Sequence, residues 1–223
     1  MKVKQPNNES RFDRQTSLQN NDKRKELKVC VVWAWGIGSN SVYCLAKQWI
    51  EHIKVIDFDK VEIENTWSQF YTEKHIGMFK VEALQEQILQ QTGVKIDIVK
   101  SKYRSSNING YDIIVLALDN LETRKQIVED CNDGQIIIDT RMVKRISQCF
   151  SFYGFQKDRW FEECYTEDSN TVQEVACTEK AIAHNALMMA WMVGSLVCDV
   201  CNNKPLYWKL QCDMSNYVLS SNR

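Results

Sequence analysis

The stretch VCVVWAWGIGSNSV at residues 29–42 constrains the fold of this chain more than any other part of its sequence. LKVCVV (27–32) is a near-continuous apolar, β-branched run, which is typical of a strand buried on both faces, and residues 38–49 fit a helix. A buried strand that turns directly into a helix through glycines is typical of a phosphate-binding loop. Gly36 and Gly38 are present, but Trp33 and Trp35 stand where such a loop needs its first glycines.

Strand and helix patterns alternate beyond this stretch. Further strands are predicted at 52–58, 94–99, 111–118 and 135–140, with helices at 80–93 and 121–133 between them. This alternation predicts an α/β fold with a doubly wound, mostly parallel, Rossmann-like sheet. The pattern changes after residue 140: 147–155 predicts an antiparallel extension, 156–176 a polar loop, 176–203 a long buried helix, and the tail one or two short strands.

Composition excludes several classes of protein. The 223 residues fit one domain, 1–223, with a polar N-terminal arm at 1–24. A net charge of −1 gives no electrostatic basis for binding nucleic acid or an anionic membrane surface. The longest apolar run, 186–198, is too short to span a bilayer, and the start MKVKQPNNESRFDRQ lacks a signal-peptide core. The nine cysteines lack the spacing of a disulfide framework, so we expect free thiols in the cytoplasm and no membrane partner.

Two aspartates follow the second predicted strand. Asp57 and Asp59 should meet the loop at 33–38, because the carboxyl ends of parallel strands share one edge of the sheet. Asp57 lies at the usual distance along the chain to accept hydrogen bonds from ribose hydroxyls. These features alone are equally compatible with a dehydrogenase.

Six elements in order and register distinguish the alternatives, and together they resemble the ubiquitin-activating-enzyme-like superfamily of adenylating enzymes (ThiF, MoeB, HesA). They span residues 11–124, and weaker similarity continues to about residue 200. The elements are Arg11-Phe12-Asp13-Arg14-Gln15, the loop 33–38, Asp57-Phe58-Asp59, Asn65 with Gln69, Ile76-Gly77 with Lys80, and Asp119-Asn120 with Arg124. Asn65, Gln69, Lys80 and Asp119-Asn120 disfavour a plain NAD dehydrogenase.

The resemblance implies ATP and Mg²⁺ as cofactors and assigns roles to individual residues. Lys80 would meet the phosphates, Asp119 would hold Mg²⁺, and Arg14 would reach the phosphates from a neighbouring subunit, which implies a homodimer. For each of these residues alone, an alternative interpretation remains open: a surface lysine for Lys80, a helix N-cap for Asp119 and a solvated arm for Arg14. The implied nucleotide-binding set is Gly36, Gly38, Asp57, Asp59, Asn65, Ser68, Gln69, Lys80, Asp119 and Asn120.

One residue departs from the family pattern on the phosphate side. The family has arginine where this chain has Ser68, which removes a cation from the pyrophosphate. The resemblance also divides the chain into a nucleotide-binding half (25–140) and a carrier-binding, C-terminal half (141–223).

The tryptophans fall where the family pattern calls for glycine. Trp33 and Trp35 replace the first two loop glycines, Trp49 a helix-ending glycine, Trp67 lies in a tight loop, and Trp191 falls where a buried helix could need a small residue. The chain has only 8 glycines, about half the usual share. We therefore expect the gene to encode glycine at 33, 35, 49 and 67. The codon expected there is UGA, which some altered genetic codes read as glycine and which was rendered here as tryptophan. Degradation of the loop by drift is the alternative.

The cysteines suggest two further sites. Cys177-Thr178 begins the last predicted helix, where a lowered thiol pKa would favour a thioester-forming nucleophile. A buried structural cysteine is an equal alternative, and His184 is interpreted as a packing residue rather than a base. Cys198 and Cys201 form one C-x-x-C pair, but structural zinc needs a second, so we expect no zinc.

The resemblance implies an ATP-dependent adenylyltransferase that activates the C-terminal carboxylate of a ubiquitin-like or sulfur-carrier protein, with thioester formation left open. The alternatives are adenylation of a peptide or a modified tRNA base, or a non-catalytic scaffold if Trp33 and Trp35 are genuine.

Overall fold

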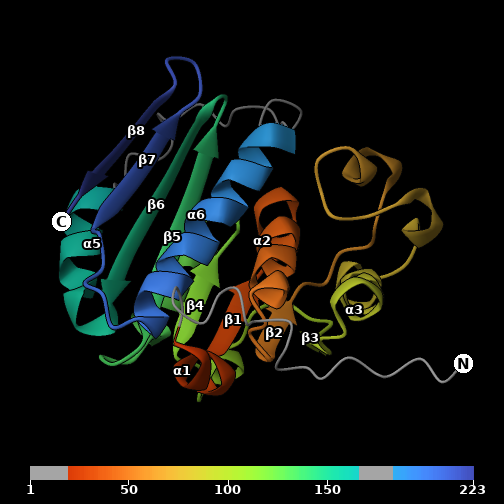
Figure 1. Ribbon diagram of the computed structural model, residues 1–223, viewed down its shortest axis with the longest axis horizontal. Coiled ribbons are helices and arrows are strands. Elements are labelled where there is room, and N and C mark those ends of the chain that lie inside the picture. The colour runs from red at the N-terminus through yellow and green to blue at the C-terminus, as the bar shows by residue number, and fades with distance from the viewer. Residues whose placement is uncertain (1–19, 166–182) are drawn as a thin grey trace, which may run out of the picture.

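The computed structural model describes residues 20–165 and 183–223. One sheet with the strand order β3-β2-β1-β4-β5-β6-β7-β8 runs through the described chain (Figure 1). The pairs within β3-β2-β1-β4-β5 are parallel, and those from β5 to β8 are antiparallel. The predicted doubly wound sheet with an antiparallel C-terminal extension is confirmed. The strands are β1 (Lys28–Val32), β2 (His52–Ile56), β3 (Asp97–Val99), β4 (Ile113–Leu116), β5 (Ile136–Val143), β6 (Ile146–Tyr153), β7 (Lys209–Asp213) and β8 (Val218–Asn222).

Helices cover both faces of the parallel strands, which explains their continuous apolar sequences. Val29 and Val31 of β1 pack toward the face of α2 (Gly36–Lys47), α3 (Lys80–Thr92) and α6 (Ala183–Cys201). Cys30 and Val32 pack into a second core with α4 (Leu121–Asp130) and α5 (Lys157–Cys164). A parallel strand between two helical layers has no polar face, so both residue sets must be apolar.

α6 is the longest described helix and lies beside α2 in front of the sheet (Figure 1). The apolar run at 186–198 was expected to be too short to span a bilayer. The helix that contains it, Ala183–Cys201, has 19 residues and by length and composition alone is apolar enough to cross a membrane, which corrects that expectation. In the fold, however, 61% of its most apolar window is buried against other elements. α6 is therefore described as a buried core helix, as its all-round apolar centre predicts.

Two local predictions have different outcomes. Gly93 ends α3 in the left-handed conformation, with φ of 81°, as the helix-ending glycine predicts. The polar loop predicted at 156–176 is wrong for its first part, because Lys157–Cys164 forms α5. Only Trp160 and Cys164 of this short helix are buried, so its apolar periodicity is too brief to recognise. α1 (Asn21–Glu26) is a short helix that precedes β1.

Candidate nucleotide site at the carboxyl edge of the sheet

The strand order reverses at β1, and the predicted site residues gather at this point. β1 pairs with β2 on one side and with β4 on the other, and the three strands end at Val32, Ile56 and Leu116. The polypeptide leaves the sheet here into α2, into the loop with Asp57, and into the turn with Asp119. A crevice at such a switch point is where open α/β sheets bind their ligands.

The loop between β1 and α2 closes tightly on the helix that follows it. A Cβ atom on Gly38 would lie 1.8 Å from the carbonyl oxygen of Trp33, so glycine is required at 38. Trp33 itself has φ of 75°, a left-handed conformation that bulky side chains very rarely adopt. Trp35 is the N-cap of α2 and supplies no side-chain cap, so the first amides of α2 lack a side-chain acceptor there. Free amides at a helix N-terminus attract phosphate.

Asp57 holds the loop together from the end of β2. Its side chain is 1% exposed, and its carboxylate accepts hydrogen bonds from the backbone amides of Ala34 (2.8 Å) and Asp59 (2.7 Å). Burial raises the pKa of this carboxyl above its usual range, while the two amides and Lys80 act in the opposite direction. Both carboxylate oxygens therefore bind backbone in the described arrangement, and the ribose role of Asp57 stays a prediction.

Lys80 is a buried cation at the first residue of α3. Only 3% of its side chain is exposed, and its Nζ lies 3.3 Å from a carboxylate oxygen of Asp59. The same Nζ lies 4.6 Å from the centre of the Trp35 ring, whose Nε1 donates to Asp59 at 2.9 Å. The alternative of an exposed surface lysine is therefore wrong. The Trp35 indole occupies the space beside the two charged groups that the family resemblance directs at ATP.

The segment with Asn65, Ser68 and Gln69 is anchored to the start of α2. Asn65 lies in a 3₁₀ turn and accepts from the amide of Glu62, and the carbonyl of Ser68 accepts from Asn40 at 3.0 Å. A side-chain oxygen of Gln69 is buried and has no partner among the described residues. Buried polar atoms are normally hydrogen-bonded, so this atom is a candidate for contact with a ligand.

Two anchoring residues escaped the sequence analysis. The side-chain amide of Asn40 also donates to the carbonyl of Gly36 at 2.7 Å, and the hydroxyl of Tyr71 donates to the carbonyl of Ala34 at 2.7 Å. Asn40 is 6% exposed and Tyr71 is 4% exposed. For Asn40 the signal available in the sequence was the polar triplet SNS at 39–41, and all three residues are buried in α2.

The turn after β4 carries Asp119 and Asn120, both exposed at the same edge. Asn120, and not Asp119, is the N-cap of α4, since its side chain accepts from the amide of Thr123 at 2.7 Å. The alternative interpretation of Asp119 as a helix cap is therefore wrong, and its carboxylate is left for another role. Arg124 is buried behind this turn.

Several predicted residues lie outside this edge or outside the described residues. Arg14 and Cys177 belong to the ranges 1–19 and 166–182, which the structure does not describe. His184 is exposed on α6, so its interpretation as a packing residue is wrong. Cys201 is buried in the core, and Cys198 lies partly buried one turn before it. Within 20–165 and 183–223, no three histidine, cysteine or acidic side chains converge as a metal site.

The structure separates the tryptophans by backbone conformation. Trp33 and Trp49 have φ of 75° and 61°, which favour glycine as the sequence analysis expects. Trp35 and Trp67 have negative φ, so geometry alone does not require glycine there. Trp191 is half exposed on α6, so the expectation of a small residue in a buried position is wrong. Trp160 and Trp208 are buried, and their indole N–H groups donate to Asp139 and Glu163.

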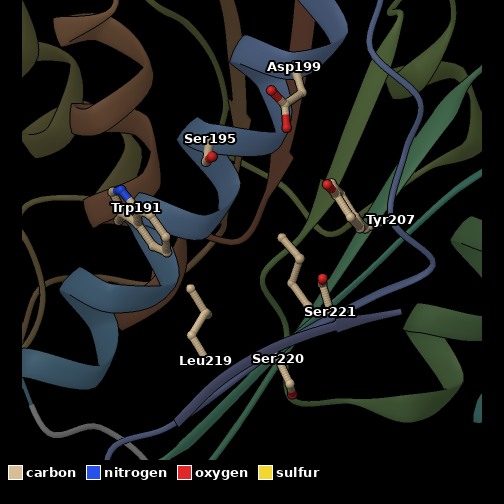
Figure 2. A pocket seen from close by; sticks show the side chains of 8 residues that line it. Trp191, Ser195, Asp199, Tyr207, Leu219, Ser220 and Ser221 are labelled. Carbon is tan, nitrogen blue, oxygen red and sulfur yellow. The ribbon is translucent and has the colours of Figure 1, made fainter. Parts of the chain in front are cut away.

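A separate groove lies between α6 and the β7–β8 hairpin, with a volume of about 310 Å³. Figure 2 shows Trp191 and Ser195 of α6 on one side and Leu219 of β8 on the other. Leu187, Trp191 and Leu219 are each at least half exposed. This half of the chain therefore presents apolar side chains to solvent beside an edge strand.

The residues at the carboxyl edge fit a triphosphate in part. The N-terminus of α2 and Lys80 suit phosphate oxygens, whereas the unpartnered amide oxygen of Gln69 is an acceptor and suits a ligand group that donates a hydrogen bond. Asp119 suits Mg²⁺, because this ion takes one or two carboxylates and completes its shell with phosphate oxygens and water. The indoles of Trp33 and Trp35, whose ring centres are 6.0 Å apart, do not fit a phosphate loop, whereas glycine at both positions would.

Curated proteins similar to this chain include an adenylyltransferase and an activating-enzyme subunit. The chain is 35% identical over 138 residues to the adenylyltransferase and sulfurtransferase MOCS3 of Aedes aegypti, covering 56% of this chain and 31% of that protein. It is 30% identical over 117 residues to SUMO-activating enzyme subunit 2 of Dictyostelium discoideum, covering 49% and 18%. The chain thus spans less than a third of the length of either relative.

Solved structures show the same fold. MccB of E. coli, crystallised with AMPCPP and MccA, superposes with a TM-score of 0.75 at 19% identity, covering 97% of this chain and 72% of that one. The ThiF family model matches residues 11–212, which include every described strand from β1 to β6 and all of β7 but its last residue. The chain therefore belongs to the ThiF family.

Proposed function

We propose that this chain is an ATP- and Mg²⁺-dependent adenylyltransferase whose substrate is a C-terminal carboxylate. A carboxylate oxygen attacks the α-phosphorus of ATP, the bond to the pyrophosphate oxygen breaks, and an acyl adenylate and pyrophosphate form. The chain needs little covalent chemistry of its own for this step, so binding, alignment and charge stabilisation account for most of the rate. The observation that carries the proposal is the buried cation of Lys80, paired with the partly exposed Asp59 beside the N-terminus of α2.

The proposed substrate is a ubiquitin-like or sulfur-carrier protein. Support comes from the names of relatives, one an adenylyltransferase and one a SUMO-activating subunit. A peptide is the second substrate class, since the fold neighbour MccB was crystallised with MccA. Homodimerisation through Arg14, thioester formation at Cys177, the cytoplasmic location and the two functional halves of the chain stay predictions.

Exchange of labelled pyrophosphate into ATP tests the activity. We expect the glycine-containing protein, Trp33→Gly with Trp35→Gly, to catalyse exchange only when a carrier with a free Gly-Gly terminus is present. The matched control is the same carrier with an amidated C-terminus, which cannot attack phosphorus and should support no exchange. A folded protein that gives no exchange with any carrier or peptide would contradict the proposed activity.

A non-catalytic scaffold is the competing function, and one observation favours it. The indole of Trp35 binds Asp59 and lies against Lys80, so genuine tryptophans would occupy the phosphate side of the site. The scaffold predicts tryptophan codons (UGG) at 33 and 35 and no ATP binding by the chain that carries these tryptophans.

We place carrier docking at the groove between α6 and β8, within the half predicted to bind the carrier. Leu219→Asp replaces an apolar side chain with a charged one. Because Leu219 is 57% exposed, folding should be little affected. We expect the KM for the carrier to rise at least about tenfold, equivalent to about 1.4 kcal/mol, while the KM for ATP stays constant. Leu89→Asp on α3, where Leu89 is 47% exposed, is the control. Equal effects of both variants would refute docking at this groove.

A further inference from the structure

A buried charge cluster lies behind the turn that carries Asp119. Asp139 of β5 is 0% exposed, and its two carboxylate oxygens bind different partners. One oxygen pairs with Arg124 of α4. The other accepts from Arg141 at 2.9 and 3.0 Å and from the indole of Trp160 at 2.9 Å. Burial raises the pKa of Asp139, but the two guanidinium groups hold it below its usual range. The carboxylate is therefore ionised and fully engaged.

Arg124 also donates to backbone carbonyls at the end of β4, just beyond it, and within β5. Its guanidinium donates to the carbonyls of Leu116, at 3.4 Å, of Leu118, and of Thr140, at 3.2 Å. Leu116 is the last residue of β4, and Leu118 directly precedes Asp119. The chain has left the ladder of the sheet at 118, so this carbonyl needs a donor from elsewhere. Arg124 supplies one from a rigid, planar group.

We propose that Arg124 is a positioning residue for Asp119, and that Asp139 fixes the orientation of its guanidinium. This inference rests on the proposed function, in which Asp119 holds Mg²⁺. Arg124 does not touch the substrate: it holds the backbone one residue before Asp119, so the carboxylate meets the metal at a constant place. A shift of about 1 Å in such a group can lower a rate about a hundredfold. Arg141 shares Asp139 but donates its other bond to the carbonyl of Cys164, away from β4.

The test compares Arg124→Met with Arg141→Met in the glycine-containing protein. Both variants remove one cation from Asp139, so a merely structural cluster predicts the same loss in each. We expect Arg124→Met to raise the Mg²⁺ concentration for half-maximal pyrophosphate exchange at least tenfold and to lower kcat. Arg141→Met should lower the melting temperature to a similar extent without moving the Mg²⁺ dependence. Arg124→Lys keeps the charge, so its Mg²⁺ concentration for half-maximal exchange should lie between those of the parent and of Arg124→Met. This variant also provides the measurement if Arg124→Met does not fold.

Equal Mg²⁺ dependence in the two methionine variants would overturn the inference, as would an effect of Arg124 on melting temperature alone. Calorimetric titration with ATP, with and without Mg²⁺, separates this inference from the proposed function. If the parent, the glycine-containing protein, binds Mg²⁺ATP but exchanges no pyrophosphate, only the proposed activity is contradicted. The increase in ATP affinity caused by Mg²⁺ is then compared between the parent and Arg124→Met. An unchanged gain in Arg124→Met, or a parent that binds no ATP, overturns the positioning role.

Discussion

Trp33→Gly together with Trp35→Gly is expected to give a protein whose melting temperature rises by about 5–10 °C in saturating ATP, whereas the chain with both tryptophans shows no rise. A ligand at about 100 times its Kd stabilises a folded protein by about 2.7 kcal/mol, and each kcal/mol shifts a chain of this size by about 2–4 °C. The substitution removes two indoles from the loop and relieves the left-handed backbone at 33, worth about 1–2 kcal/mol. Thermal denaturation with and without Mg²⁺ATP measures the effect.

Trp160→Gly provides the matched control for this substitution. Trp160 is fully buried and its indole N–H binds Asp139, so its loss should cost about 3–5 kcal/mol and give no ATP response. No ATP shift in the double glycine variant would contradict a functional phosphate loop. The gene offers an independent check: tryptophan codons (UGG) at 33, 35, 49 and 67 would eliminate the glycine hypothesis.

Lys80→Met in the glycine-containing protein is expected to lower pyrophosphate exchange about a hundredfold to a thousandfold, as loss of one group that stabilises transition-state charge usually does. Methionine keeps the length and apolar character of the stem, which is 3% exposed, while the charge beside Asp59 disappears. The rate of exchange at saturating ATP and carrier measures the loss.

Lys74→Met is the comparison, because Lys74 is about half exposed and its ion pair with Glu86 lies on the surface. Such pairs contribute about 0–1 kcal/mol to stability and nothing to this chemistry, so the exchange rate should stay within about twofold. A loss of less than about threefold in Lys80→Met, with folding intact, would remove Lys80 from the proposed phosphate contacts.

Much of this fold could be predicted from local sequence. Continuous apolar runs marked β1, β4 and β5, because a strand between two helical layers buries both faces. Gly38 and Gly93 follow from backbone geometry that a Cβ atom obstructs or disfavours. The glycine expected at 33 and 49 follows from the family pattern, and the positive φ at both positions supports it.

Other features depend on contacts between distant segments. α5 escaped prediction because it is short and only Trp160 and Cys164 face the core. Asn40 and Tyr71 acquire a role only when the loop at 65–71 folds onto α2. The direction of the Asp57 carboxylate was also not predictable, since it depends on the backbone amides of Ala34 and Asp59. Sequence spacing specifies which residues share an edge of the sheet, but not where each side chain points.

The sequence by itself determined the alternation of strands and helices from β1 to β5 and the carboxyl edge as the place where their polar side chains meet. These follow from periodicity, from glycine stereochemistry and from the geometry of parallel strands, all of which act over short distances along the chain. The assignment of Lys80 and Asp119 to the site follows from the family resemblance and stays a prediction. Only the tertiary structure decided that Lys80 is buried against Asp59 and that Asn120 rather than Asp119 caps α4. It also decided that Arg124 binds the backbone of the turn between β4 and α4. The pairs Lys80–Asp59 and Arg124–Asp139 depend on side chains that meet after the sheet has assembled, and residues 15 or more apart in the chain share no local pattern that records such a contact. The Asn120 cap is local, but the structure was needed to choose between two adjacent polar residues.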